Sequence, residues 1–218
     1  MVKYSPMIDS LAYTITFLRH GESVGNAEDR FQGQADFPLT EKGRAQAQAL
    51  ADRWRTEKVA FDKCIASPLL RARQTAEIIC ATLNLPLEFD PDWMEIDNGL
   101  VAGLTEEQAE QVAPRPGFVT PYTRFGKTGE SRWELYLRAG RAIQHLLDRA
   151  PGNYLVAAHG GILSMTLYAI LGIPLQADSG GPRFTFHNTT FTTFSYKPER
   201  HSWRMLNFDN RQHWKEGE

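Results

Sequence analysis

The chain contains few cysteines, no excess of charge of one sign and no long uninterrupted apolar run. Its 218 residues include only two cysteines, Cys64 and Cys80, too few for a disulfide framework. We therefore expect buried, reduced thiols and a cytoplasmic location. The formal net charge of −2 offers no basic surface for nucleic acid. The 42% of hydrophobic residues is typical of an ordinary globular protein.

Secretion and membrane insertion are not expected either. Residues 1–11 contain charged residues and a proline and lack the apolar core of a signal peptide. The most hydrophobic stretch, residues 154–175, is interrupted by His159 and two glycines. Its first part has strand character and its second part helix character, so we interpret it as a buried strand followed by a buried helix.

Strand-like and helix-like segments alternate along the chain. Strands are predicted at residues 14–18, 60–66, 85–89 and 154–158, with two late, edge-type strands at 184–196 and 203–207. Helices are predicted at residues 40–54, 67–83, 132–149 and 161–171. This order predicts an α/β fold, a three-layer sandwich in which helices cover both faces of a mainly parallel sheet.

Residues 91–131 break the alternation because they are rich in proline and glycine. We interpret the chain as one domain, residues 1–218, in which an insertion at about residues 97–131 caps a site. The late strand near residues 191–196 could pair with a second copy across a two-fold axis to give a homodimer, although an edge strand is more often only an edge.

Two histidines follow buried strands and locate that site. His20 comes after the strand at 14–18, and His159 after the strand at 154–158. Ligands of such sheets bind outside the carboxyl ends of the strands. Beside His20, Arg19 supplies a cation, and Ser23 and Asn26 supply neutral donors. A phosphate group needs several such donors to leave water.

A third strand end adds an arginine. Ser67 and Pro68 predict a helix start with Ser67 as the cap, and Arg71 then lies one turn inside, near a helix N-terminus that favours anions. Arg73 is the neighbouring alternative, and helix position alone does not separate the two.

The motifs occur in a characteristic order along the chain. They are Leu18-Arg19-His20-Gly21-Glu22-Ser23 with Asn26, Pro38-Leu39-Thr40, Ser67-Pro68-Leu69-Leu70-Arg71-Ala72, Glu95, Gly129-Glu130-Ser131 with Arg138, and Ala158-His159-Gly160-Gly161. This ordered set resembles the histidine phosphatase superfamily, specifically its phosphoglycerate-mutase-like branch. The resemblance runs from Thr14 to about Asn210.

The resemblance implies a role for each of these residues. His20 would be the nucleophile that becomes phosphohistidine, and Glu95 the proton donor, with Asp97 as the competing carboxylate. The implied catalytic residues are His20, Glu95, Arg19, Arg71 and His159. The implied phosphate-binding residues are Arg19, His20, Ser23, Asn26, Arg71, His159 and Gly160. No metal and no cofactor is implied, because arginines stabilise the charge of the transferring group.

Physical chemistry supports the nucleophile. Attack on phosphorus requires a neutral imidazole, and two nearby guanidinium groups should lower the pKa of His20 below the free value of about 6.5. The expected reaction is metal-independent hydrolysis of a small phosphorylated metabolite through phosphohistidine. Arg115, Arg124, Lys127 and the aromatics Phe118, Tyr122 and Phe125 would suit an anionic or sugar-like phosphomonoester, but could equally form ordinary surface.

Three alternatives remain. A phosphomutase would use the same His20, but the resemblance places an aromatic and basic run around the acid of such enzymes, where this chain has Glu95-Ile96-Asp97-Asn98-Gly99. Residues 99–103 are Gly-Leu-Val-Ala-Gly, whereas many related phosphatases carry a Trp-Glu pair between two glycines at this place. A metal hydrolase lacks its usual His and Cys spacing here. A non-catalytic phosphate-binding relative is disfavoured because every implied catalytic residue is present.

Overall fold

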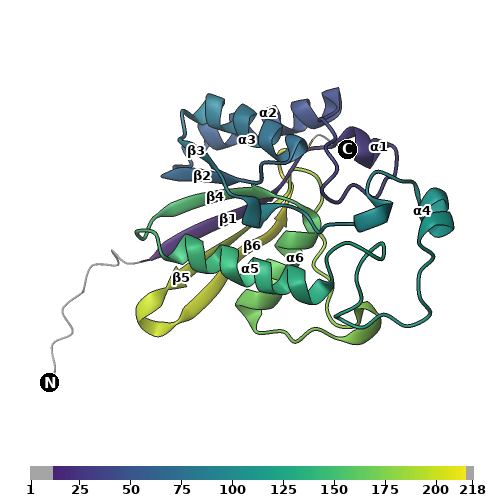
Figure 1. Cartoon of the computed structure of the whole chain (residues 1–218). Helices are drawn as coiled ribbons and strands as arrows, with labels where there is room; N and C mark the ends of the chain where they lie inside the picture. The colour runs from purple at the N-terminus through teal and green to yellow at the C-terminus, as the bar shows by residue number, and fades with distance from the viewer. Residues whose placement is uncertain (1–11, 215–218) are drawn as a thin grey trace, which may run out of the picture.

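The computed structural model describes residues 12–214, so the segment read for a secretion signal lies outside the described residues. Its centre is one six-stranded sheet in the order β3-β2-β4-β1-β5-β6 (Figure 1). The strands are β1 (Tyr13–Arg19), β2 (Lys63–Ala66), β3 (Leu87–Phe89), β4 (Asn153–Ala158), β5 (Phe191–Lys197) and β6 (Ser202–Asn210).

Helices cover both faces of this sheet (Figure 1). The α-helices are α1 (Val24–Ala27), α2 (Glu41–Thr56), α3 (Leu70–Leu83), α4 (Glu106–Val112), α5 (Arg132–Leu147) and α6 (Gly160–Leu171). The 3-10 turns are η1 (Pro91–Trp93), η2 (Gly99–Val101), η3 (Ala177–Ser179) and η4 (Pro198–Arg200). α2 and α3 lie on one face, and α5 and α6 on the other. Strands β3, β2, β4 and β1 are parallel, which confirms the predicted three-layer α/β architecture.

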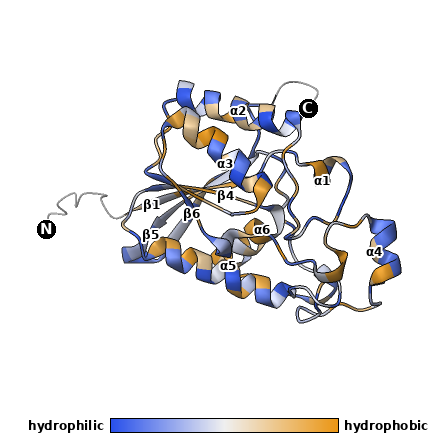
Figure 2. Ribbon diagram, turned by 45° about the horizontal axis from the view of Figure 1, so that its top comes forward, coloured by the Kyte–Doolittle hydropathy of each residue, from blue (hydrophilic) through white to orange (hydrophobic). Residues whose placement is uncertain are grey.

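Neighbouring side chains of a strand point to opposite faces of the sheet, so a hydrophobic core forms on each face. Phe17 and Val156 face α5 and α6, whereas Leu18 and Leu155, the residues next to them, face α2 and α3. The helices meet these faces with apolar stripes, which Figure 2 shows as orange beside blue. Both cysteines are buried and unbridged.

Two predicted elements differ in the structure. The predicted strand at 184–196 begins only at Phe191, and it is not an edge: β5 pairs with β1 on one side and β6 on the other. Its hydrogen-bonding groups are used inside the sheet, so it has no free edge for a second copy, and the edge is β6. Ser67 does not cap α3, whose N-cap is Leu69.

Residues 91–131 contain one α-helix that the sequence did not predict. α4 begins after a capping box between Thr105 and Gln108. The segment lies at the carboxyl end of the parallel strands (Figure 1), where Arg30 and Thr105 form a bridge and the Gly103 amide donates to the Phe31 carbonyl at 2.7 Å.

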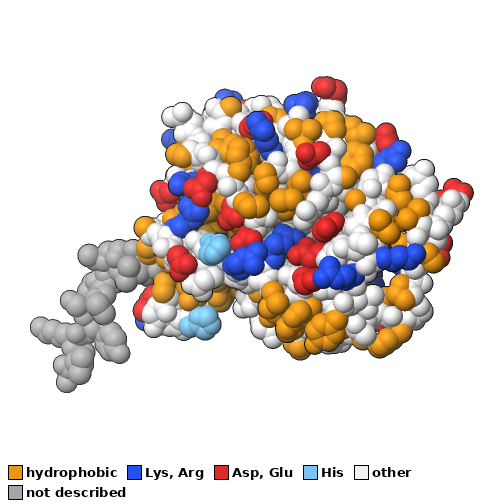
Figure 3. Space-filling model, viewed as in Figure 1, with side chains coloured by type: hydrophobic (Ala, Val, Ile, Leu, Met, Phe, Trp, Pro, Cys, Tyr) orange, Lys and Arg blue, Asp and Glu red, His pale blue; other side chains and the backbone are white. Residues whose placement is uncertain are grey.

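The charge of the surface bears on nucleic-acid binding, and the length and apolarity of the helices bear on membrane insertion. On the face seen in Figure 3, basic and acidic side chains are mixed rather than gathered in a basic stripe. Within residues 12–214, none of the helices combines the length and the apolarity that crossing a bilayer requires.

Candidate active site

Strand register brings the two histidines together. Arg19 of β1 lies opposite Ala158 of β4, so the residues that follow, His20 and His159, leave the sheet side by side. The His20 amide donates to the Ala158 carbonyl at 3.0 Å, and the ring centroids are 5.1 Å apart. Ser67 joins them because its amide bonds the Ala157 carbonyl at 2.9 Å.

The surroundings of His20 fix its tautomer. Nδ1 lies 2.7 Å from the Gly21 carbonyl oxygen, which can only accept, so the ring proton sits on Nδ1. Nε2 keeps its lone pair and accepts from Arg71 Nε at 3.2 Å. Burial lowers the pKa of His20 well below its usual value, and Arg71 and Arg19 lower it further. The direction is the one predicted, but burial contributes more than the arginines.

Arg71, rather than Arg73, enters this site. Its side chain is buried, and its terminal nitrogens donate to the carbonyls of Ala35 at 3.0 Å and Gly33 at 2.7 Å. Burial lowers the pKa of Arg71 to about 10, which leaves it charged at neutral pH. Arg73 is exposed and paired with Glu77.

His159 is held by the strand-end serine. Its Nε2 lies 2.7 Å from Ser67 Oγ, which already accepts from the Leu69 amide at 3.3 Å. A serine hydroxyl has one hydrogen and two lone pairs, so this contact forms with either neutral tautomer of the ring. Nδ1 is buried and has no partner among the described residues. Burial, followed by the charge of Arg71, lowers the pKa of His159 well below its usual value.

Arg19 lies beside the start of α6. Its Nη1 donates to the Phe186 carbonyl at 2.6 Å, while Nε is buried without a partner in the described chain. Gly160 opens α6 here, and a Cβ on it would stand 3.9 Å from Arg19 Nε. Burial lowers the pKa of Arg19, and the charge of Glu95 acts in the opposite direction.

Glu95, rather than Asp97, lies against the N-terminus of α6. Its Oε2 accepts from the Gly161 amide at 2.9 Å, and its Oε1 from the Ile162 amide at 3.0 Å and the Ile96 amide at 2.9 Å. Acceptance on both oxygens suits the carboxylate. Asp97 instead accepts from the Gly99 amide at 2.8 Å, within its own turn.

Ser23 caps a helix, whereas the sequence predicted that it binds phosphate. It is fully buried, and its hydroxyl caps α1 and contacts Asn26 and Gln32, so we withdraw it from the phosphate ligands. Asn26 accepts through Oδ1, and none of the described residues engages its Nδ2 group. Asn188, which the sequence did not single out, donates to the His20 carbonyl at 3.0 Å and to Asn26 Oδ1 at 3.2 Å.

A cavity of about 680 Å³ is lined mainly by residues of the 97–131 segment. Its lining includes Ile96, the residue after Glu95, and Glu130, whose carboxylate accepts from the Asp97 amide at 3.4 Å. Of the residues considered for substrate binding, Arg115, Arg124, Lys127 and Phe125 line it. Phe118 and Tyr122 do not, and both are well exposed.

No group of three or more His, Cys, Asp or Glu within the described ranges could hold a metal ion. The positive charge at the candidate site comes from Arg19 and Arg71.

The family model described as the histidine phosphatase superfamily (branch 1) matches residues 15–209. The chain belongs to this family. The probable phosphoglycerate mutase GpmB of Cronobacter sakazakii is 35% identical over 188 residues, which cover 84% of this chain and 85% of that protein.

Solved structures of the family share the fold. Bacillus stearothermophilus YhfR has 27% identity and a TM-score of 0.76, covering 92% of this chain and 98% of its own. A mycobacterial glucosyl-3-phosphoglycerate phosphatase has 26% identity and a TM-score of 0.74, covering 92% and 100%. Family and neighbours together support an enzyme of the phosphatase or mutase kind.

Proposed function

We propose that the chain hydrolyses small phosphomonoesters through a phosphohistidine on His20, without a metal. The observation that carries this proposal is the hydrogen bond from His20 Nδ1 to the Gly21 carbonyl, at 2.7 Å. It leaves Nε2 as a neutral nucleophile at the carboxyl end of β1. Arg71 and Arg19 stand beside it to bind the phosphoryl oxygens.

The first step transfers the phosphoryl group. Nε2 of His20 attacks phosphorus, the bond from phosphorus to the ester oxygen breaks, and Glu95 gives that oxygen its proton, so the alcohol leaves. Arg19, Arg71, His159, Asn26 and the start of α6 at Gly160 hold the phosphoryl oxygens. Fixed donors of this kind are the main contribution a protein makes to phosphoryl transfer.

The second step releases phosphate. Glu95 is now the carboxylate, the form that its three amide bonds suit. It takes a proton from water as the water oxygen attacks phosphorus. The bond from phosphorus to Nε2 breaks, and His20 regains its lone pair. Residues 97–131 serve as the cap of a single domain, and their cavity receives the alcohol part of the substrate.

Hydrolysis of 4-nitrophenyl phosphate, with and without a chelator and beside His20→Ala, tests this proposal. We expect activity that resists the chelator and disappears in the variant, with an unchanged circular dichroism spectrum. Loss of activity with the chelator, or full activity in His20→Ala, would contradict it.

Phosphoglycerate mutase activity is the second candidate, because relatives at 35% identity carry that name. Both reactions share the first step. With phosphoglycerate and a phosphorylated primer, a mutase isomerises the substrate faster than it releases inorganic phosphate. The hydrolase that we propose releases phosphate faster.

A further inference from the structure

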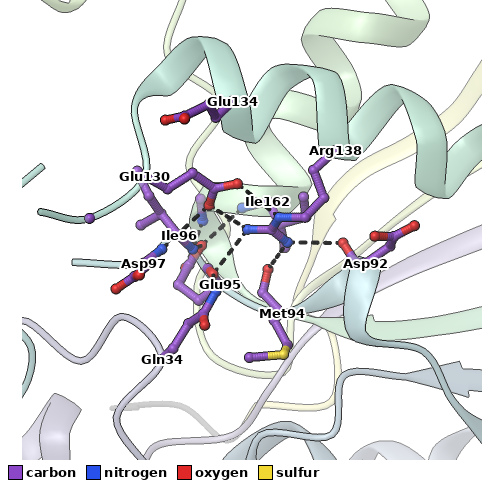
Figure 4. A network of polar contacts seen from close by, with 12 residues as sticks. Gln34, Asp92, Met94, Glu95, Ile96, Asp97, Glu130, Glu134, Arg138 and Ile162 are labelled. Atoms are coloured by element: carbon purple, nitrogen blue, oxygen red, sulfur yellow. Dashed lines mark hydrogen bonds and ion pairs between the residues drawn. The ribbon is translucent and has the colours of Figure 1, made fainter. Parts of the chain in front are cut away.

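Arg138 of α5 makes an unusually complete set of hydrogen bonds next to the site (Figure 4). Its side chain is 12% exposed and pairs with Glu130, through Nε at 2.9 Å and Nη2 at 2.6 Å. Its terminal nitrogens also donate to the backbone carbonyls of Asp92 at 3.0 Å, Met94 at 2.6 Å and Glu95 at 3.1 Å. The guanidinium contacts backbone and a carboxylate, none of which belongs to the reacting groups.

The three carbonyls belong to the irregular segment that carries Glu95. This segment has no strand ladder to fix it, so its carbonyls need other donors. A planar guanidinium reaches several acceptors in fixed directions, which a lysine ammonium does not. Gln34 adds a second donor to the Glu95 carbonyl, at 3.1 Å (Figure 4).

Glu95 is therefore fixed from two sides. Its carboxyl group lies on the first amides of α6, and its carbonyl is held by Arg138 from α5. Glu130 extends the connection to the cap, because its amide donates to the Asp97 carbonyl at 2.8 Å.

We propose that Arg138 is a positioning residue: through the backbone of residues 92–95 it holds the Glu95 carboxyl group where the ester oxygen departs. Glu130 keeps the guanidinium in place. This inference rests on the proposed function, in which Glu95 protonates that oxygen. It predicts that loss of Arg138 weakens the proton transfer selectively rather than all activity equally.

Two substrates distinguish a selective loss of proton transfer from an equal loss of all activity. The leaving group of 4-nitrophenyl phosphate departs without a proton, whereas that of glycerol 2-phosphate needs one. kcat/KM reports only the steps up to transfer onto His20. We define the acid ratio as kcat/KM for glycerol 2-phosphate divided by kcat/KM for 4-nitrophenyl phosphate. General acid catalysis contributes about 10²–10⁴-fold, so Glu95→Gln should lower the acid ratio by at least about 100-fold.

Arg138→Lys keeps the charge opposite Glu130, so the variant should fold. We expect it to lower the acid ratio by about tenfold or more, part of the acid's contribution. In a Glu95→Gln background it should lower the ratio no further. The matched control is Arg141→Lys, the same change one turn along α5. Arg141 is 55% exposed, and within residues 92–95 it binds only the Asp92 carboxylate. The acid ratio of Arg141→Lys should therefore stay at the wild-type value.

The outcomes are distinct. An acid ratio that falls in Arg138→Lys and not in Arg141→Lys supports the positioning role. A ratio unchanged in Arg138→Lys, with both rates falling together, overturns it and leaves the role of Glu95 intact. If Glu95→Gln itself leaves the ratio unchanged, the proton-donor assignment fails, and the positioning role fails with it.

Discussion

At the scale of single residues, hydrogen bonds decide what each histidine can do. Ser67 contacts Nε2 of His159 at 2.7 Å and thereby orients the imidazole ring. Ser67→Ala should lower kcat/KM about two- to tenfold, because one oriented hydrogen bond is worth about 0.5–1.5 kcal/mol. Steady-state kinetics checks this. Thr16→Val, which removes a buried hydroxyl contact to Thr193 elsewhere on the sheet, is the control and should keep kcat/KM. Equal activity in both variants would contradict the role of Ser67.

The protonation states of His20 and His159 form a second residue-scale prediction. Burial and the neighbouring charges lower both pKa values well below 6.5. Nitrogen NMR of the imidazole rings should therefore show both as neutral at pH about 6, where a free histidine is mostly protonated. Assignment comes from His20→Ala and His159→Ala spectra. A charged ring at either position would show that the site does not supply a neutral nucleophile by this route.

At the scale of elements, the backbone of α2 lies directly against the loop that follows β1 and carries His20, with no side chain between them. A Cβ on Gly43 would stand 2.0 Å from the Glu22 carbonyl oxygen, and a Cβ on Gly21 would stand 2.5 Å from the Gly43 oxygen. Gly43→Ala should lower the free energy of unfolding by about 1–3 kcal/mol, as overpacking does, and reduce activity by displacing His20.

Gly140 supplies the matched control. It is also helical, and a Cβ there would meet nothing within 4 Å. Gly140→Ala should therefore stabilise the protein by about 0.5–1 kcal/mol and leave activity unchanged. Urea unfolding and 4-nitrophenyl phosphate turnover measure both variants. A tolerated Gly43→Ala would mean that the loop is not fixed by this close approach.

The sequence predicted the elements that depend on local signals. The strand at 14–18 and the helix capped by Thr40 follow from alternation and capping, and both are confirmed. The roles of Ser67 and Asn188 depend on strand register and on contacts across the chain, which no local pattern carries. The same holds for β5, which has the sequence pattern of an edge strand. Its partner β6 follows a turn, and only the sheet order shows which strand is outermost.

At the scale of the whole molecule, neutral buried histidines make stability depend on pH. Burial lowers the pKa of His213 from 6.5 to about 4. As the pH falls below 6.5, the unfolded chain binds a proton that the folded chain does not, so the free energy of unfolding decreases until about pH 4. His20 and His159 act in the same direction. The pKa of Glu88 is held at about 2 by Arg149 and Lys63, so its contribution is lost only below its ordinary value of 4.5.

His213→Gln should reduce this dependence. Urea unfolding at pH about 7.5 and at pH about 5 measures the change in the free energy of unfolding. This free energy should fall more in the wild-type protein than in the variant, because the variant lacks one of the titrating groups. An equal loss in both proteins would remove His213 from this account.

The reaction that we propose requires His20 to carry the phosphoryl group on Nε2. Its most direct test is to mix the enzyme with excess 4-nitrophenyl phosphate, quench within the first turnovers in alkali, where phosphohistidine survives, and map the modification by peptide mass spectrometry and with an antibody selective for Nε2-phosphohistidine. We predict one phosphoryl group on the His20 peptide, recognised by that antibody and absent from His20→Ala. Phosphate on another residue, on Nδ1, or on none while turnover continues would contradict the account.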